Sequence, residues 1–179
     1  MKYSLLKIAA LSALIACSGL ALAVSLVPLN TLLPNAAVTV QQQLPNRSFA
    51  LPGQLPAPAK DQHYYLYVDT AQDQYTLDFD KTADCHGAKY CNAGSLSAIN
   101  HGNPEIYYNA ANQPLTRLTH LNGNVPAFYT PAHAVADYWP AMLEWRSGST
   151  LYRLRWQGDI NKATLSEIAE SVQNFPSKE

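Results

Sequence analysis

The chain has 179 residues, with 12 Lys or Arg and 13 Asp or Glu, so its formal net charge at pH 7 is only −1. A charge this close to zero, without a basic run after the amino-terminal segment, argues against nucleic acid as a partner. The length suits one domain with a single hydrophobic core.

The amino terminus predicts export. Lys2 and Lys7 precede an uncharged apolar run over residues 8–29, which is the layout of a secretory signal whose basic end stays in the cytoplasm. We therefore expect residues 1–29 to be a signal peptide or membrane anchor. The rest of the chain would then lie in the periplasm or cell envelope.

Three processing outcomes are open for this segment. Ala21 and Ala23 offer the small side chains that signal peptidase requires before Val24, and cleavage there would release a soluble chain. Residues 14–17, Leu-Ile-Ala-Cys, resemble a bacterial lipobox, which implies a lipidated Cys17 at the new amino terminus. Without cleavage, ~22 apolar residues in a helix reach roughly 33 Å, which is enough to anchor the chain in a bilayer.

The composition changes over residues 30–60, where five prolines and a triple glutamine occur. Proline at this density favours an extended, semi-rigid chain over a packed element. We therefore predict a Pro-rich linker over 30–60 and a single folded domain over 61–179.

After residue 61, apolar and polar side chains mostly alternate, which indicates strands. Residues 63–69, 75–80 and 94–100 are the first three predicted strands. In 75–80 the apolar side chains occupy the odd positions, so we expect the odd face to be buried. The even face, which includes Asp78 and Asp80, is expected to be wet.

Cys85 and Cys91 lie in a turn-rich stretch between the second and third strands. As the only cysteines of an exported domain, they are predicted to form a disulfide. Closing so short a loop stabilises by about 2 kcal/mol. A zinc site would recruit His86 and His101, but the five-residue gap between the cysteines exceeds the usual spacing of zinc ligands. A thioredoxin-like redox pair needs two intervening residues.

Two hairpins are predicted further along the chain. Residues 115–121 and 125–130 flank an Asn-Gly turn at 122–123, and these residue types accept the positive φ of a tight turn. A second hairpin is expected over 141–157, around a Ser-Gly-Ser turn. Its second strand alternates aromatic or apolar residues with arginines, as one solvated face requires.

A helix is predicted near the carboxyl terminus. Thr164 and Glu167 have the spacing of a capping box, and Leu165, Ile168 and Val172 recur at helical spacing. So short a helix gains little from propensity, so it is expected to pack on the sheet. The fold class predicted for the whole is α+β: an antiparallel sheet of short strands and hairpins with a C-terminal helix packed on one face.

Two stretches carry a resemblance. LEWRSGSTLYRLRWQGDINKATLSEIAESV (143–172) resembles the last hairpin and helix of small uncharacterised domains of bacterial exported proteins, and DCHGAKYCNAGSL (84–96) is similar to the cysteine loop of some of them. The resemblance implies export and the fold. It implies no catalytic residue and no cofactor.

The sequence contains none of the familiar catalytic or cofactor-binding motifs. There is no G-x-S-x-G elbow, no H-E-x-x-H helix, no phosphate loop and no dinucleotide fingerprint. The acidic residues Asp78, Asp80 and Asp84 lack the glycine-centred loop of a calcium site, so they are interpreted as a solvated strand end. We therefore predict no catalytic residue, no cofactor and no metal.

The chain is rich in aromatic residues, with 11 tyrosines and 3 tryptophans. Adjacent strand residues point to opposite faces, so one of Tyr64 and Tyr65, and one of Tyr107 and Tyr108, should face outward as a binding surface. We predict a non-catalytic module that binds an envelope protein, glycan or lipid. The alternative is a hydrolase acting on an envelope polymer, for which a pocket joining a nucleophile, a histidine and a carboxylate would be the signature.

Overall fold

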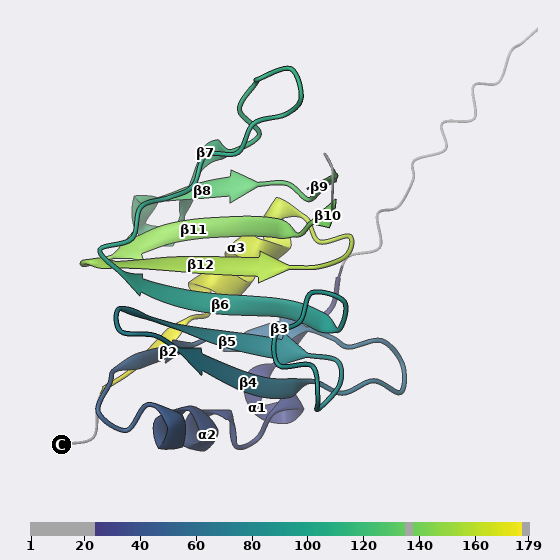
Figure 1. Cartoon of the computed structure of the whole chain (residues 1–179), viewed down its shortest axis with the longest axis vertical. Coiled ribbons are helices and arrows are strands. Elements are labelled where there is room, and N and C mark those ends of the chain that lie inside the picture. The colour runs from purple at the N-terminus through teal and green to yellow at the C-terminus, as the bar shows by residue number, and fades with distance from the viewer. Residues whose placement is uncertain (1–23, 135–137, 177–179) are drawn as a thin grey trace, which may run out of the picture.

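The computed structural model describes residues 24–134 and 138–176 and contains one large sheet, with the helix near the carboxyl terminus behind it (Figure 1). The sheet has seven antiparallel strands. In spatial order they are β4 (Tyr65–Thr70), β5 (Gln74–Asp80), β6 (Asn92–Asn100), β12 (Thr150–Trp156), β11 (Ala141–Ser147), β8 (Val125–Thr130) and β7 (Arg117–Leu121). The predicted α+β class is confirmed.

Both predicted hairpins are confirmed. β7 and β8 are joined by the single turn η1 (Asn122–Asn124), in which Gly123 has a φ of 69°. β11 and β12 are joined through Gly148, whose φ is 59°. Both turns therefore use the left-handed backbone region that glycine reaches without strain.

The strand predicted over 94–100 becomes the centre of the sheet. β6 has nine residues and lies between β5 and β12, so it is longer than expected. Its partner β12 starts 50 residues after the end of β6, at Thr150, which pairs with Asn100. This long-range pairing joins the two halves of the sheet.

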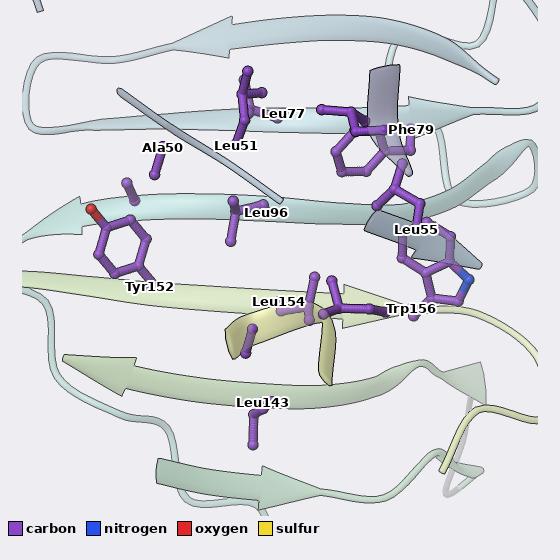
Figure 2. Close-up of a cluster of buried hydrophobic side chains, with 14 of the residues drawn as sticks. Ala50, Leu51, Leu55, Leu77, Phe79, Leu96, Leu143, Tyr152, Leu154 and Trp156 are labelled. Carbon is purple, nitrogen blue, oxygen red and sulfur yellow. The ribbon is translucent and has the colours of Figure 1, made fainter. Parts of the chain in front are cut away.

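One face of the sheet forms the hydrophobic core. Leu77, Leu96, Leu154 and Leu143 follow one another in register across β5, β6, β12 and β11, and each is 0% exposed. Figure 2 shows these leucines in one row, with Phe79 beside them. The buried odd face predicted for residues 75–80 is therefore confirmed.

The side chains at the even positions of β5 are less exposed to solvent than predicted. Asp80 is only 1% exposed, and Asp78 is half-buried. The prediction was wrong for Asp80 because the disulfide loop folds back over the end of β5, where the Gly87 N–H donates to the Asp80 carboxylate at 3.0 Å.

The predicted helix is α3 (Lys162–Glu170), which lies behind the sheet in Figure 1 and contacts β11, β12 and β7. Leu165 and Ile168 are fully buried, as expected. The predicted cap was wrong: Asn161 is the N-cap, and its side chain accepts a hydrogen bond from the backbone N–H of Thr164 at 2.9 Å. Asn161 supplies the side-chain oxygen that satisfies a free N–H group of the first turn. Thr164 is therefore not needed as a cap, and it is buried in the first turn of the helix.

The predicted linker over 30–60 was also wrong, because this segment is packed. Its elements, together with the strand before it and the last strand of the chain, are β1 (Leu26–Pro28), α1 (Leu29–Leu32), α2 (Ala36–Gln43), β2 (Phe49–Leu51), β3 (Gln54–Pro56) and β13 (Gln173–Phe175). Val40, Ala50 and Leu55 are 0% exposed. Pro34 and Pro45 lie in turns of a compact layer, where a fixed φ is as useful as in an extended tether, and Pro56 ends the short strand β3.

Specific hydrogen bonds hold this layer to the sheet and to the C-terminal end of α3. The Ala50 N–H donates to the Tyr75 hydroxyl at 2.6 Å, and the Gly53 N–H donates to the backbone oxygen of Ser171 at 2.9 Å. β1 pairs with β3 and β2 pairs with β13. The folded domain thus includes β1, inside the segment predicted as signal or anchor, and is not confined to the residues after 61.

The remaining predictions on the amino terminus concern residues outside the described part. Lys2, Lys7 and Cys17 lie there, so export and lipidation stay predictions. Within residues 24–134 and 138–176, no helix has the length and apolar character needed to cross a bilayer.

Candidate functional site

The face of the sheet opposite α3, which we name the outer face, is polar in its central strands. Asp78 of β5 pairs in register with Ser95 of β6, and Ser95 pairs with Arg155 of β12. Residues directly opposite one another in neighbouring strands project to the same side of the sheet. These three side chains therefore form a polar row across three strands.

A cavity of about 390 Å³, which we name the outer pocket, lies over this row. The hydroxyls of Thr76 and Ser97 also line it and are 2.9 Å apart. Trp139 forms a further wall. Within the described part of the chain, neither a histidine nor a cysteine lines the pocket. A volume of this size lies within the range of about 300–1,000 Å³ that is usual for small-ligand sites.

A second cavity, of about 470 Å³, lies between the amino-terminal layer and the segment after β12. Its titratable lining groups are Tyr64, Lys81 and Asp159. Burial raises the pKa of Tyr64 to about 12, so this hydroxyl is neutral at physiological pH. The outer pocket, which brings a carboxylate, a guanidinium and several hydroxyls together, is the better candidate site.

The disulfide loop forms one side of the outer pocket. Cys85 and Cys91 are joined, with an S–S distance of 2.07 Å, so the predicted disulfide is confirmed and neither sulfur is a thiolate ligand for zinc. Gly87 and Lys89, which lie within this loop, line the pocket. The disulfide thus shapes a wall of the candidate site.

Asn92 joins the loop to the strand beneath it. Its side-chain amide donates to Asp78 Oδ1 at 3.0 Å and to Asp80 Oδ1 at 2.9 Å. Asp80 also accepts from the Gly87 N–H at 3.0 Å. Asp80 is therefore fully engaged in holding the loop, and Asp78 is the carboxyl that faces the pocket.

The pKa of Asp78 is raised to about 6. Burial is the main cause and the nearby Asp80 carboxylate adds to it, while the Asn92 hydrogen bond and the Arg155 charge oppose the rise. The carboxyl thus changes its charge within about one unit of neutral pH. Groups with a perturbed pKa cluster at functional sites, because function often requires a pKa that an exposed side chain does not have.

Trp139 is held at the rim of the pocket by other rings. It lies 5.9 Å from Tyr107 and is stacked on His133 at 6.4 Å, measured between ring centroids. The Lys89 Nζ atom lies 5.8 Å from the Trp139 centroid. Trp139 is nevertheless 43% exposed. It therefore combines a fixed position with apolar surface that faces solvent.

A buried ion pair positions Tyr107 and hence Trp139. Glu144 is 0% exposed and accepts from Arg153 Nε at 2.6 Å and from the Glu105 N–H at 2.8 Å. Arg153 also pairs with the Glu105 carboxylate at 2.6 Å, and the Tyr107 hydroxyl donates to that carboxylate. The chain between β6 and β7 is thereby fixed across the outer face.

The four tyrosines predicted as a binding surface have different environments. Tyr64 is 9% exposed, and its hydroxyl donates to the Pro56 oxygen at 3.1 Å, so it is a core residue and not a surface one. Tyr65 is exposed on β4, so one residue of this adjacent pair faces outward, as expected. Tyr107 contacts Trp139, and Tyr108 is exposed. The last two lie in the connection between β6 and β7, not on a strand of the sheet as predicted.

The sequence reasoning did not single out Ser95, Arg155 or Trp139. A signal existed, because Asp78, Ser95 and Arg155 each occupy a polar position between apolar neighbours in their strands. What the sequence lacked was the order of the strands, which brings the three positions together.

No group of three His, Cys, Asp or Glu side chains within the described residues has the arrangement of a metal site. Comparisons of the chain with protein-family models, with curated proteins and with solved structures found no match. The resemblance to domains of bacterial exported proteins therefore stays a prediction.

Proposed function

We propose that the protein is an exported cell-envelope protein that works by binding, with the outer pocket as its recognition site. The observation that carries this proposal is the polar row Asp78–Ser95–Arg155 beneath a cavity of about 390 Å³, walled by the disulfide loop and Trp139. A concave site with a few convergent polar groups and one perturbed pKa is the usual form of a binding site.

The composition of the pocket favours binding over catalysis. Hydroxyls line it, but no described histidine does, so the lining residues offer no imidazole to accept a proton from Ser95 or Thr76. Asp78 is the one carboxyl among the described lining residues. A glycosidase needs two carboxyls that face each other across the bond to be cleaved.

The amino-terminal packing supports export with cleavage after Ala23. Leu26 pairs with Pro56 in the β1–β3 sheet, and Leu29 is buried. Cleavage before Val24 would leave the whole domain intact, with two residues ahead of β1. A membrane anchor ending at Ser25 would have ~18 residues and reach about 27 Å, which is short for a bilayer core of about 30 Å.

The test is capture of a partner from solubilised envelope fractions by the immobilised exported protein. Arg155→Ala should lose what the wild type retains, while Arg117→Ala, a matched removal of an exposed arginine on the edge strand β7, should not. Equal retention by all three proteins would contradict the outer pocket as the binding site.

A second candidate function is a hydrolase acting on an envelope polymer. One observation favours it: a carboxyl with a pKa of about 6, such as Asp78, is suited to act as a general acid. Release of soluble fragments from envelope polymers by the wild type, abolished in Asp78→Asn, would establish this alternative in place of binding alone.

A further inference from the structure

We infer that the outer pocket holds a saccharide unit, which hydrogen-bonds to Asp78, Ser95 and Arg155 and packs against Trp139. The inference rests on the proposed function, because it names the ligand class of that same pocket. Four features of the pocket lead to it: its mixture of donors and acceptors, its aromatic wall, its charge and its size.

The first feature is the mixture of hydrogen-bonding groups. The Asp78 carboxylate accepts, the Ser95 hydroxyl both donates and accepts, and the Arg155 guanidinium only donates. Within the described residues, that guanidinium makes no hydrogen bond and no ion pair. Sugar hydroxyls donate and accept at closely spaced positions, so they satisfy all three groups. A lipid tail would leave these groups desolvated and unpaired.

The second feature is the aromatic wall. The ring of Trp139 is held by Tyr107 and His133 and keeps 43% of its surface exposed. The C–H groups of a sugar ring form an apolar patch that packs on such a surface, while the hydroxyls at its edge point toward polar groups. Because Trp139 is already immobilised, little side-chain entropy is lost on contact.

The third feature is the charge. Arg155 and Lys89 bring two positive charges to the lining and Asp78 brings one negative charge. The Asp78 carboxylate, at the end of the polar row, repels a phosphate but accepts from a hydroxyl. Because the lining carries charges of both signs, it fits a neutral or weakly acidic saccharide, whose hydroxyls pair with either sign.

The fourth feature is the size. A cavity of about 390 Å³ that is open to solvent accommodates a sugar residue whose two linkages continue outward. A chain that leaves the pocket over β4 would pass the exposed ring of Tyr65, which shares the outer face because it pairs with Asp80.

The test is a titration of the ¹⁵N-labelled exported protein, followed by NMR. The probes are the tetramer of N-acetylglucosamine, maltotetraose and tetragalacturonic acid, each up to ~10 mM, which detects millimolar dissociation constants. We expect at least one of them to shift the signals of Gly87, Ser95 and the Trp139 side-chain N–H. The neutral and acidic probes show which kind of saccharide is preferred.

Variants make the assignment specific. Arg155→Ala and Trp139→Ala should each weaken binding about tenfold, since each removes one main contact. Arg117→Ala is the matched control and should bind as the wild type does. The dispersion of the NMR spectrum shows whether each variant is folded. If one of them is not folded, Ser95→Ala, which is a smaller change, is tested in its place.

The outcomes separate the inference from the proposed function. Absence of shifts with all three probes, or shifts confined to residues away from the pocket, would overturn the saccharide inference. If envelope capture still depends on Arg155 in that case, the proposed function stands with another ligand class. If neither capture nor titration depends on Arg155, both fall.

Discussion

Gly87 lies so close to Asp78 that a Cβ atom added to this glycine would be 2.7 Å from Asp78 Oδ2. The φ of Gly87 is also positive, at 74°. The disulfide loop therefore reaches the carboxyl of the outer pocket through the one residue type that has no side chain.

We predict that Gly87→Ala destabilises the domain more than Gly123→Ala. Gly123 has a similar φ of 69° but has nothing within 4 Å of an added Cβ, so its substitution reports backbone strain alone, about 1 kcal/mol. Gly87→Ala should cost roughly 1 kcal/mol more, because Asp78 or the loop must move. Urea denaturation of both variants measures the difference, and equal losses would show that the contact is relieved without cost.

Reduction of the Cys85–Cys91 disulfide should lower the free energy of unfolding by about 2 kcal/mol, because the unfolded chain gains entropy when a short loop opens. The same reduction should weaken capture by the outer pocket, since the loop supplies Gly87 and Lys89 to its lining. Chemical denaturation with and without reductant, with alkylation to count thiols, tests both effects. An unchanged denaturation midpoint in the fully alkylated protein would contradict this role.

Asp78→Asn should stabilise the domain at neutral pH. The folded-state pKa of Asp78, about 6, exceeds its ordinary value of 3.8, so the folded protein binds a proton more tightly than the unfolded chain does. The contribution of Asp78 to the stability of the wild type therefore falls as pH rises from about 4 to about 6. Burial is the main cause of the raised pKa; the charges of Asp80 and Asp69 add to the rise, and the charge of Arg155 opposes it.

After allowance for screening by water, we expect the Asn variant to gain about 1 kcal/mol at pH 7, which is ~2–4 °C in the melting temperature. The gain should shrink as pH falls below about 6 and vanish below pH ~3, where Asp78 is protonated in both states. Thermal unfolding at several pH values is the measurement. A variant that melts below the wild type at pH 7 would show that the charged carboxylate stabilises the fold.

Tyr64→Ala and Tyr65→Ala should differ sharply although the residues are adjacent. Tyr64 is buried against Trp156, with ring centroids 5.9 Å apart, so its removal leaves a cavity and should cost about 3–5 kcal/mol. Tyr65 is 44% exposed, and its removal should cost about 0.5 kcal/mol or less. Denaturation midpoints of the two variants decide: equally large losses would place both rings in the core, and equally small losses would place both at the surface.

We predict that the exported protein begins at Val24. Cleavage after Ala23 preserves β1, in which Leu26 pairs with Pro56. Intact-mass measurement of the soluble and membrane fractions distinguishes this product from a lipidated Cys17 and from the full-length chain. A diacylated species in the membrane fraction would contradict this prediction and show that the chain is lipidated at Cys17.

The sequence by itself determined the local elements of this protein. Alternation of side chains predicted β5 and its buried face, Asn-Gly at 122–123 predicted the β7–β8 turn, and helical spacing placed α3. The pairing of Cys85 with Cys91 followed from counting cysteines. Each of these features depends on neighbours within a few residues, where periodicity and turn chemistry act directly.

Only the tertiary structure decided how distant segments meet. The proline-rich segment looks extended locally, yet Val40 and Leu55 become buried because the sheet offers them an apolar face. Asp78, Ser95 and Arg155 form a pocket only because β6 pairs with β12 across more than 50 residues. Such pairing is selected by the total apolar surface that the assembled layers bury, a quantity that no short stretch of sequence contains.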